Sequence, residues 1–229
     1  MTSEPGLVVV TGAAGALGRA VLTDLRNRGY EVAAMDLAGP GLAELGADDG
    51  VHPVGVDLAD RSAVTAAFEQ VDAIGVPTGL VTLAGGFRPS SLADLTEDLL
   101  DSMWRSNVAS LLWCCQGVAS RMAAGGGGSI VTVGSKTAVG GAAPVAHAGS
   151  KAAVVRITEL LAEELRPQRI RVNCVLPSVI DTPANRSWMT PELAARAVAP
   201  LTIARVIAFL LGPDAEPISG ARVPVYGDA

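Results

Sequence analysis

Charged and aromatic side chains are scarce in this sequence of 229 residues. Asp, Glu, Lys and Arg together make up 17%, and Phe, Trp and Tyr only 3%. The formal net charge is −6 and no run of Lys or Arg occurs, which argues against binding to nucleic acid or to an anionic membrane. No stretch of about 18 apolar residues is present, so no membrane-spanning helix is expected. Hydrophobic residues nevertheless reach 49%, enough for a sizeable core.

Cysteine is equally rare. The chain has three cysteines, and two of them, Cys114 and Cys115, are adjacent, so they cannot form a disulfide framework. They have no metal-ligand spacing, and no cluster of His or acidic residues completes a set of ligands, so no metal site is expected. A reducing cytoplasm is the simplest location for such a chain.

Apolar runs alternate with segments of helical periodicity. Strands are expected at residues 7–10, 31–36, 51–58, 79–84, 129–134, 170–176 and 222–226. Helices are expected at residues 16–29, 62–73, 96–122, 144–165 and 200–211. The strands are mostly apolar on both faces, which is typical of a parallel sheet covered by helices on both sides. We therefore predict a single α/β domain over residues 1–229, a doubly wound, Rossmann-like parallel sheet.

A glycine-rich turn follows the first strand and opens the first helix. It reads TGAAGALG and includes Gly12, Gly15 and Gly18. In this context glycines allow the backbone to approach a pyrophosphate, and the N-terminus of the helix attracts its charge. The alternative is an ordinary glycine-rich turn between a strand and a helix.

Asp36 ends the second strand, roughly 20 residues beyond the glycines. A carboxylate there accepts hydrogen bonds from the ribose hydroxyls of a dinucleotide and repels a 2′-phosphate. Because Leu37, rather than Arg or Lys, comes next, the pattern favours NAD over NADP, although an exposed strand-end aspartate is the alternative. Asp57, at the end of the third strand, either reaches the adenine or caps the following turn.

With these residues in place, the chain resembles the short-chain dehydrogenase/reductase family over nearly its whole length. Residues 11–18 are similar to that family's TGxxxGxG turn, with Ala16 in place of the middle glycine. Residues 81–85, VTLAG, stand where the family has Asn-Asn-Ala-Gly, so both asparagines are replaced. Residues 177–182, PSVIDT, resemble the segment that lines the nicotinamide, and residues 222–227 resemble the closing strand.

The resemblance implies a role for each of several residues. Asn107 matches the asparagine that holds a helix kink and a water, Ser135 the serine that holds the substrate oxygen, and Lys151 the lysine of YxxxK, which also binds the nicotinamide ribose. The expected cofactor contacts are Gly12, Ala14, Gly15, Leu17, Gly18, Asp36, Asp57, Leu58, Leu83, Ala84, Gly85, Lys151, Pro177, Ile180 and Thr182.

His147 stands four residues ahead of Lys151, where the family has its catalytic tyrosine. The two residues share one face of the expected helix. Imidazole is about 2 Å shorter than phenol, a gap that a water could bridge. Beside Lys151 its pKa is expected to fall below about 6.5, which makes it neutral at pH 7 and a better base than acid. The alternative is a histidine left without a catalytic role.

The family places a variable substrate lid at residues 183–199. Arg186 in this segment either pairs with an acidic group of the substrate or is solvated. Phe87 is expected to border the same mouth. Trp104 and Trp113 lie on the long helix that in this family often packs against a second subunit, so both are expected in the core or an interface. A homodimer or homotetramer is implied by the resemblance alone.

Three functions remain open at this point. The first is an NAD-dependent oxidoreductase that acts on a small secondary alcohol or ketone, with His147 moving the proton. The second is a non-redox enzyme on the same scaffold, such as an isomerase, dehydratase or cyclase. The third is a catalytically silent NAD-binding protein. Function depends on the site rather than on the fold, so the geometry around His147 is decisive.

Overall fold

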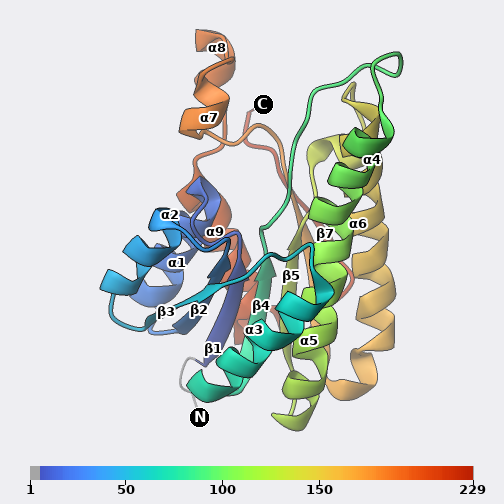
Figure 1. Ribbon diagram of the computed structural model, residues 1–229. Coiled ribbons are helices and arrows are strands. Elements are labelled where there is room, and N and C mark those ends of the chain that lie inside the picture. Colours follow the sequence, from blue (N-terminus) through green and yellow to red (C-terminus); the bar gives the residue numbers. More distant parts are fainter. Residues whose placement is uncertain (1–5, 229) are drawn as a thin grey trace.

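A single seven-stranded sheet organises the chain (Figure 1). The computed structural model describes residues 6–228, so residues 1–5 and 229 of the predicted domain lie outside the described part. The strands are β1 (Leu7–Thr11), β2 (Glu31–Asp36), β3 (Val51–Gly55), β4 (Pro77–Thr82), β5 (Gly128–Val133), β6 (Ile170–Pro177) and β7 (Arg222–Val225). Their order is β3-β2-β1-β4-β5-β6-β7, and all neighbours are parallel. The predicted doubly wound fold is confirmed.

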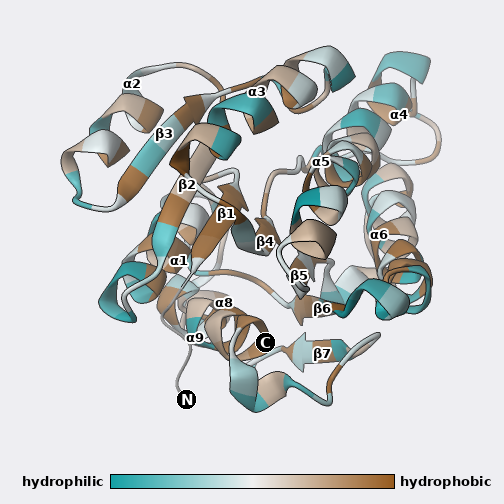
Figure 2. Cartoon of the chain, turned by 90° about the horizontal axis from the view of Figure 1, so that it is seen from below, coloured by the Kyte–Doolittle hydropathy of each residue, from teal (hydrophilic) through white to brown (hydrophobic). Residues whose placement is uncertain are grey.

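Helices cover both faces of this sheet. They are α1 (Ala16–Asn27), α2 (Pro40–Ala43), α3 (Arg61–Ile74), α4 (Glu97–Trp104), α5 (Ser110–Ala124), α6 (Val145–Glu164), α7 (Pro183–Arg186), α8 (Pro191–Ala194) and α9 (Pro200–Leu211). Successive strand residues point to opposite faces, so Val8 and Val10 pack with α1 and α9, while Val9 packs with α3, α5 and α6. Figure 2 shows the same division, with hydrophobic strands between helices whose outer sides are largely hydrophilic.

Most predicted elements agree with the observed ones to within two residues at each end, and two differ by more. The third strand ends at Gly55 rather than at residue 58, because it is an edge strand and the chain then turns to cap α3: Asp60 N–H donates to Asp57 O, and the Asp60 side chain accepts from Ser62 N–H. The predicted helix at residues 96–122 begins at its expected cap, Thr96, but contains a π-helical turn at Arg105–Ala109 between α4 and α5.

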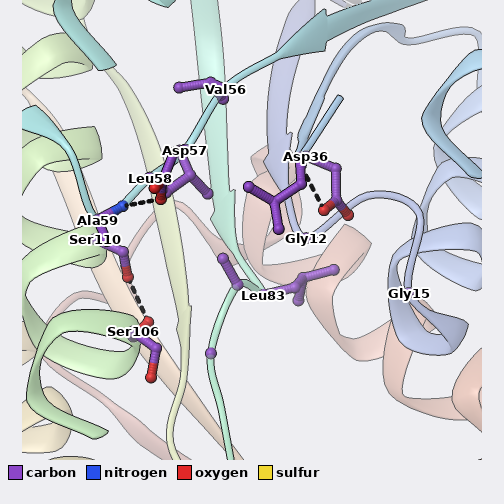
Figure 3. A pocket seen from close by; sticks show the side chains of 13 residues that line it. Gly12, Gly15, Asp36, Val56, Asp57, Leu58, Ala59, Leu83, Ser106 and Ser110 are labelled. Atoms are coloured by element: carbon purple, nitrogen blue, oxygen red, sulfur yellow. Dashed lines mark hydrogen bonds between the residues drawn. The ribbon is translucent and has the colours of Figure 1, made fainter. Parts of the chain in front are cut away.

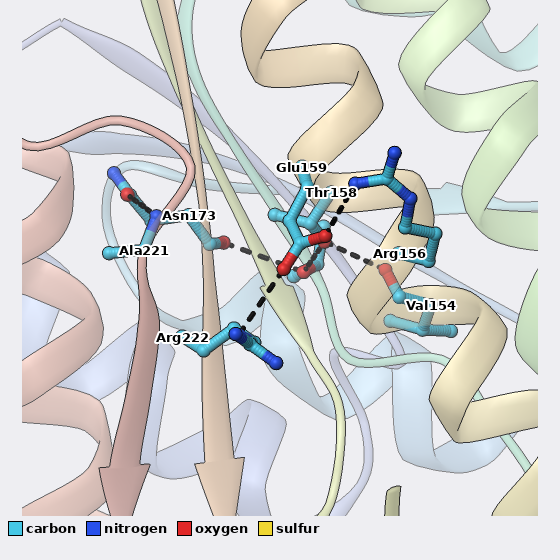
Figure 4. Close-up of polar contacts among 8 residues, drawn as sticks. Val154, Arg156, Thr158, Glu159, Asn173, Ala221 and Arg222 are labelled. Carbon is cyan, nitrogen blue, oxygen red and sulfur yellow. Dashed lines mark hydrogen bonds and ion pairs between the residues drawn. The ribbon is translucent and has the colours of Figure 1, made fainter. Parts of the chain in front are cut away.

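Polar contacts stabilise the β7 edge of the sheet, where β7 pairs with β6 alone. The Asn173 side chain on β6 accepts a hydrogen bond from Ala221 N–H at 3.0 Å. Glu159 on α6 lies between Arg156 and Arg222 and pairs with both (Figure 4). The Glu159–Arg222 pair links the last strand to the helix that also bears His147.

Candidate active site

A cleft opens at the carboxyl ends of β1 and β4, where the strand order reverses. This is the position at which open parallel sheets bind ligands. Its cavity of about 350 Å³ is drawn in Figure 3, and the predicted residues that line it are Gly12, Gly15, Asp36, Asp57, Leu58, Leu83, Ala84 and Gly85. Leu37, Val56, Ala59, Ser106 and Ser110 also line it and were not predicted.

A second hollow of about 450 Å³ adjoins the first and shares Gly12, Gly15 and Leu83 with it. Its other predicted lining residues are Leu17, Gly18 and Thr182. Among the predicted contacts, Ala14, Pro177 and Ile180 line neither hollow. Ala14 faces Asp36 through its amide, Pro177 ends β6, and Ile180 forms an isolated bridge with Val198. The two hollows together form one elongated cleft that leads from Asp36 towards the lid.

The glycine-rich turn brings backbone close to backbone. Gly12 has φ +64°, and a Cβ there would lie 2.8 Å from Ala84 N. Thr11, which was not among the predicted site residues, holds the turn next to the loop after β4. Its Oγ1 accepts hydrogen bonds from Leu83 N–H and Ala84 N–H, each at 3.1 Å. Helix α1 starts at Gly15 without a side-chain cap, so its first amide groups have no side-chain acceptor. A narrow turn with uncapped amides fits the pyrophosphate of a dinucleotide.

Asp36 is oriented by the turn that it faces. Its Oδ2 accepts from Ala14 N–H at 2.9 Å, and its Oδ1 accepts from Leu37 N–H at 2.7 Å. Both oxygens keep a further lone pair for a ligand. Asp57 uses Oδ1 to accept from Ala59 N–H at 2.9 Å, which is the turn-capping alternative (Figure 3).

Asn107 lies buried in the π-helical turn, and its side-chain amide is fully engaged. Oδ1 accepts from Gly86 N–H at 2.9 Å, and Nδ2 donates to Gly86 O at 3.1 Å and to Ser150 Oγ at 2.9 Å. Ser150 Oγ in turn donates to His147 O at 2.8 Å. Asn107 therefore connects the loop after β4 to the first turns of α6. Ser150 was not predicted, although its place directly before Lys151 was a usable signal.

Lys151 reaches the carboxyl end of β5. Its Nζ donates to Val133 O at 2.8 Å, and burial lowers its pKa to about 8. A Cβ on Gly85 would lie 3.4 Å from this Nζ and 2.5 Å from Asn107 Oδ1, so glycine is needed at this close approach. Ser135 follows the same strand; its hydroxyl lies 2.8 Å from Thr137 Oγ1 and accepts from Thr137 N–H.

His147 is buried, with 9% of its surface exposed. The edge of Phe87 approaches its ring with centroids 4.9 Å apart and an interplanar angle of 74°. Its buried Nδ1 has no hydrogen-bond partner among residues 6–228. Burial, and after it the charge of Lys151, lowers the His147 pKa to about 4. The predicted direction is confirmed, but the main cause is burial rather than the lysine. The imidazole is therefore neutral at pH 7.

The lid consists of α7, α8 and their connections, which stand above the sheet (Figure 1). Arg186 is exposed and pairs with Asp181, with Nη2 2.7 Å from Oδ2, so a substrate group would share it with this carboxylate. Trp188 is 57% exposed. Of the two tryptophans expected in a core or interface, Trp113 packs partly buried against the core and Trp104 is exposed.

No helix within residues 6–228 combines the length and the apolar character needed to cross a membrane. The same residues contain no group of three His, Cys, Asp or Glu side chains placed to hold a metal ion.

The fold and the cleft define a Rossmann-like protein, and the comparisons identify the family. Residues 6–193 match the family model described as short chain dehydrogenase. D-xylose 1-dehydrogenase of Caulobacter vibrioides is 31% identical over 93% of this chain and 91% of the relative, and D-threitol dehydrogenase of Mycolicibacterium smegmatis is 33% identical over 96% and 91%. A solved oxidoreductase of the short chain dehydrogenase/reductase family from Burkholderia thailandensis superposes with a TM-score of 0.89 at 27% identity, covering 98% of this chain and 92% of that one. The chain belongs to the short-chain dehydrogenase/reductase family of oxidoreductases.

Proposed function

We propose that this protein transfers a hydride between NAD and a secondary alcohol or ketone, with His147 moving the proton. The single observation that carries the cofactor assignment is the charge of the cleft. Its lining contains two aspartates, Asp36 and Asp57, and neither Lys nor Arg. A 2′-phosphate would meet a carboxylate without a compensating cation, whereas free ribose hydroxyls would find an oriented acceptor in Asp36. This balance favours NAD over NADP.

The named relatives support the reaction type. Two of them are named for the dehydrogenation of D-xylose and of D-threitol, and a third, 30% identical over 96% of the chain, is named L-xylulose reductase. When bound, nicotinamide supplies a two-electron acceptor or donor for the carbinol carbon. The chain has to orient the alcohol oxygen and handle its proton.

Ser135 and His147 divide that task. The Ser135 hydroxyl ends β5 and donates to the alcohol oxygen, a role that requires it to turn from Thr137. Neutral His147 accepts the alcohol proton, directly or through one bridging water. With a pKa of about 4 it is a weak base that releases the proton to solvent at pH 7, which favours oxidation over reduction. Lys151 contributes positive charge beside the reacting oxygen.

A pair of histidine variants tests this assignment, because the chain has only two histidines. His147→Phe keeps a ring against Phe87 and removes both nitrogens, so NAD-dependent alcohol oxidation should fall by about 100-fold or more. His52→Phe is the matched control: His52 lies on the edge strand β3, with Nε2 2.8 Å from Glu31, and its loss should leave turnover unchanged. Oxidation is followed at the NADH absorbance, and NAD affinity of both variants by calorimetry.

The outcomes separate the remaining functions. Unchanged turnover in His147→Phe would remove His147 from the mechanism. Substrate conversion without NADH formation would favour a non-redox enzyme, and tight NAD binding without any turnover a silent binding protein. Failure to bind either NAD or NADH would overturn the proposal. The expected homodimer or homotetramer and the cytoplasmic location stay predictions, to be tested by light scattering and by cell fractionation.

A further inference from the structure

The segment between Ser135 and His147 offers a substrate almost nothing polar. Residues 138–146 read AVGGAAPVA, nine consecutive residues without a hydrogen-bonding side chain. Val139 and Val145 within this segment are exposed, at 50% and 56%. Thr137, directly before it, is engaged with Ser135. The segment that joins Ser135 to His147 therefore offers a ligand only methyl groups and backbone.

The lid has polar side chains, and several of them bond to neighbouring groups. Arg186 is paired with Asp181, and the Asn185 amide donates to Ile180 O at 2.9 Å. Three hydroxyls are used in the same way: Thr182 and Thr190 cap the two short helices, and Ser187 donates to Ala184 O. The large lid side chain that stays exposed without such a bond is Trp188.

Phe87 forms a third apolar element. It follows Gly85 and Gly86 at the end of the loop from β4, and its ring contacts the His147 ring although 58% of it is exposed. The neighbouring Arg88 is exposed to water. Aromatic residues are only 3% of the chain, yet two of them, Phe87 in the loop after β4 and Trp188 in the lid, are exposed.

We infer that the substrate carries its alcohol or ketone on an apolar body, such as an alicyclic, aryl-alkyl or alkyl chain, rather than on a sugar or polyol. The inference rests on the proposed function and names the substrate class for the same site. Additional hydroxyls brought against these surfaces would lose water without gaining a partner, which costs about tenfold or more in affinity for each one. A methylene buried there gains roughly fourfold. The substrate class thus differs from the sugars and polyols in the names of several relatives.

Substrates matched in carbon number test this inference. For NAD-dependent oxidation, kcat/KM should be about 1000-fold higher for 2-butanol than for D-threitol, and for 2-pentanol than for D-xylose, because each sugar or polyol carries three additional hydroxyls. It should rise about 16-fold from 2-butanol to 2-hexanol, as two methylenes predict. Equal or higher kcat/KM for the polyol or sugar would overturn the inference while leaving the proposed function in place.

Two tryptophans of similar exposure supply matched variants. Trp188→Ala should raise KM for 2-hexanol about tenfold and leave KM for D-threitol unchanged. Trp104→Ala, on the outer helix α4 and 47% exposed, should change neither. Equal effects of the two variants would show that Trp188 does not contact the substrate.

Binding separates this inference from the proposed function. Calorimetry with cyclohexanone and with D-xylulose on the NADH-saturated protein gives a readout that needs no turnover. Tighter binding of cyclohexanone supports an apolar substrate even if no alcohol is oxidised, and tighter binding of D-xylulose overturns it. Loss of NADH binding would count against the proposed function alone. The apolar-substrate inference could still be tested, because the affinities of the two ketones can be compared on the protein without NADH.

Discussion

Replacement of Asp36 by Ala is the sharpest test of the cofactor assignment. The carboxylate is half-buried at the end of β2, and Ala14 N–H and Leu37 N–H, at 2.9 and 2.7 Å, hold it in one orientation. Two ribose hydroxyls that donate to a charged, pre-oriented acceptor contribute about 1.5 kcal/mol each at the lower end of the usual range. The loss of about 3 kcal/mol corresponds to an NAD dissociation constant about 100-fold higher.

NADP should respond differently. Removing the carboxylate also removes its repulsion of a 2′-phosphate, so NADP binding should not weaken, and the preference for NAD should fall by about 100-fold or more. Titration calorimetry with both dinucleotides measures the two constants directly. A melting curve checks that the turn, which loses acceptors for two partly hydrated amides, still folds.

Asp57→Ala is the matched control within the same cleft. Its carboxylate bond to Ala59 N–H lies inside a local turn, so NAD affinity should change by less than about threefold. An NAD dissociation constant that is unchanged in Asp36→Ala would refute the ribose assignment. A large loss in Asp57→Ala instead would place the adenine on that side chain.

Three other predictions follow from the same geometry. The kcat/KM for oxidation should rise with pH through about 4, where His147 becomes neutral, and fall above about 8, where Lys151 loses its charge; a rate that climbs through pH 8 would assign the base to the lysine. Thr11→Val leaves two backbone amides without their acceptor and should lower the free energy of unfolding by about 2–3 kcal/mol in urea denaturation, and a loss below about 0.5 kcal/mol would contradict this role. Gly18→Ala places a methyl 2.3 Å from a backbone carbonyl oxygen, so it should lower the free energy of unfolding by about 2–3 kcal/mol and weaken NAD binding. Gly39→Ala has open space around its Cβ position and should change neither the free energy of unfolding nor NAD binding.

Much of the fold was predictable because its signals are local. Apolar strands alternate with amphipathic helices, and a glycine-rich turn links the first pair. The expected capping threonine, Thr96, does begin α4. The end of β3 was not predictable in the same way. The apolar residues Val56 and Leu58 continue the strand pattern, but they pack against the helix layer beyond the sheet edge, and the chain turns there.

The sequence by itself determined the parallel sheet, the glycine-rich turn and the acidic residue at the end of β2, because backbone periodicity and turn chemistry act over a few neighbouring residues. The strand order, and with it the position of the cleft at the carboxyl ends of β1 and β4, came from the tertiary structure. Only the tertiary structure decided the surroundings of His147. Its burial against Phe87 and the bond from Asn107 to Ser150 join segments that lie 60 and 43 residues apart in the chain, and its Nδ1 has no hydrogen-bond partner within residues 6–228. Such contacts depend on how helices pack over the sheet, and burial, more than the neighbouring lysine, then lowers the imidazole pKa.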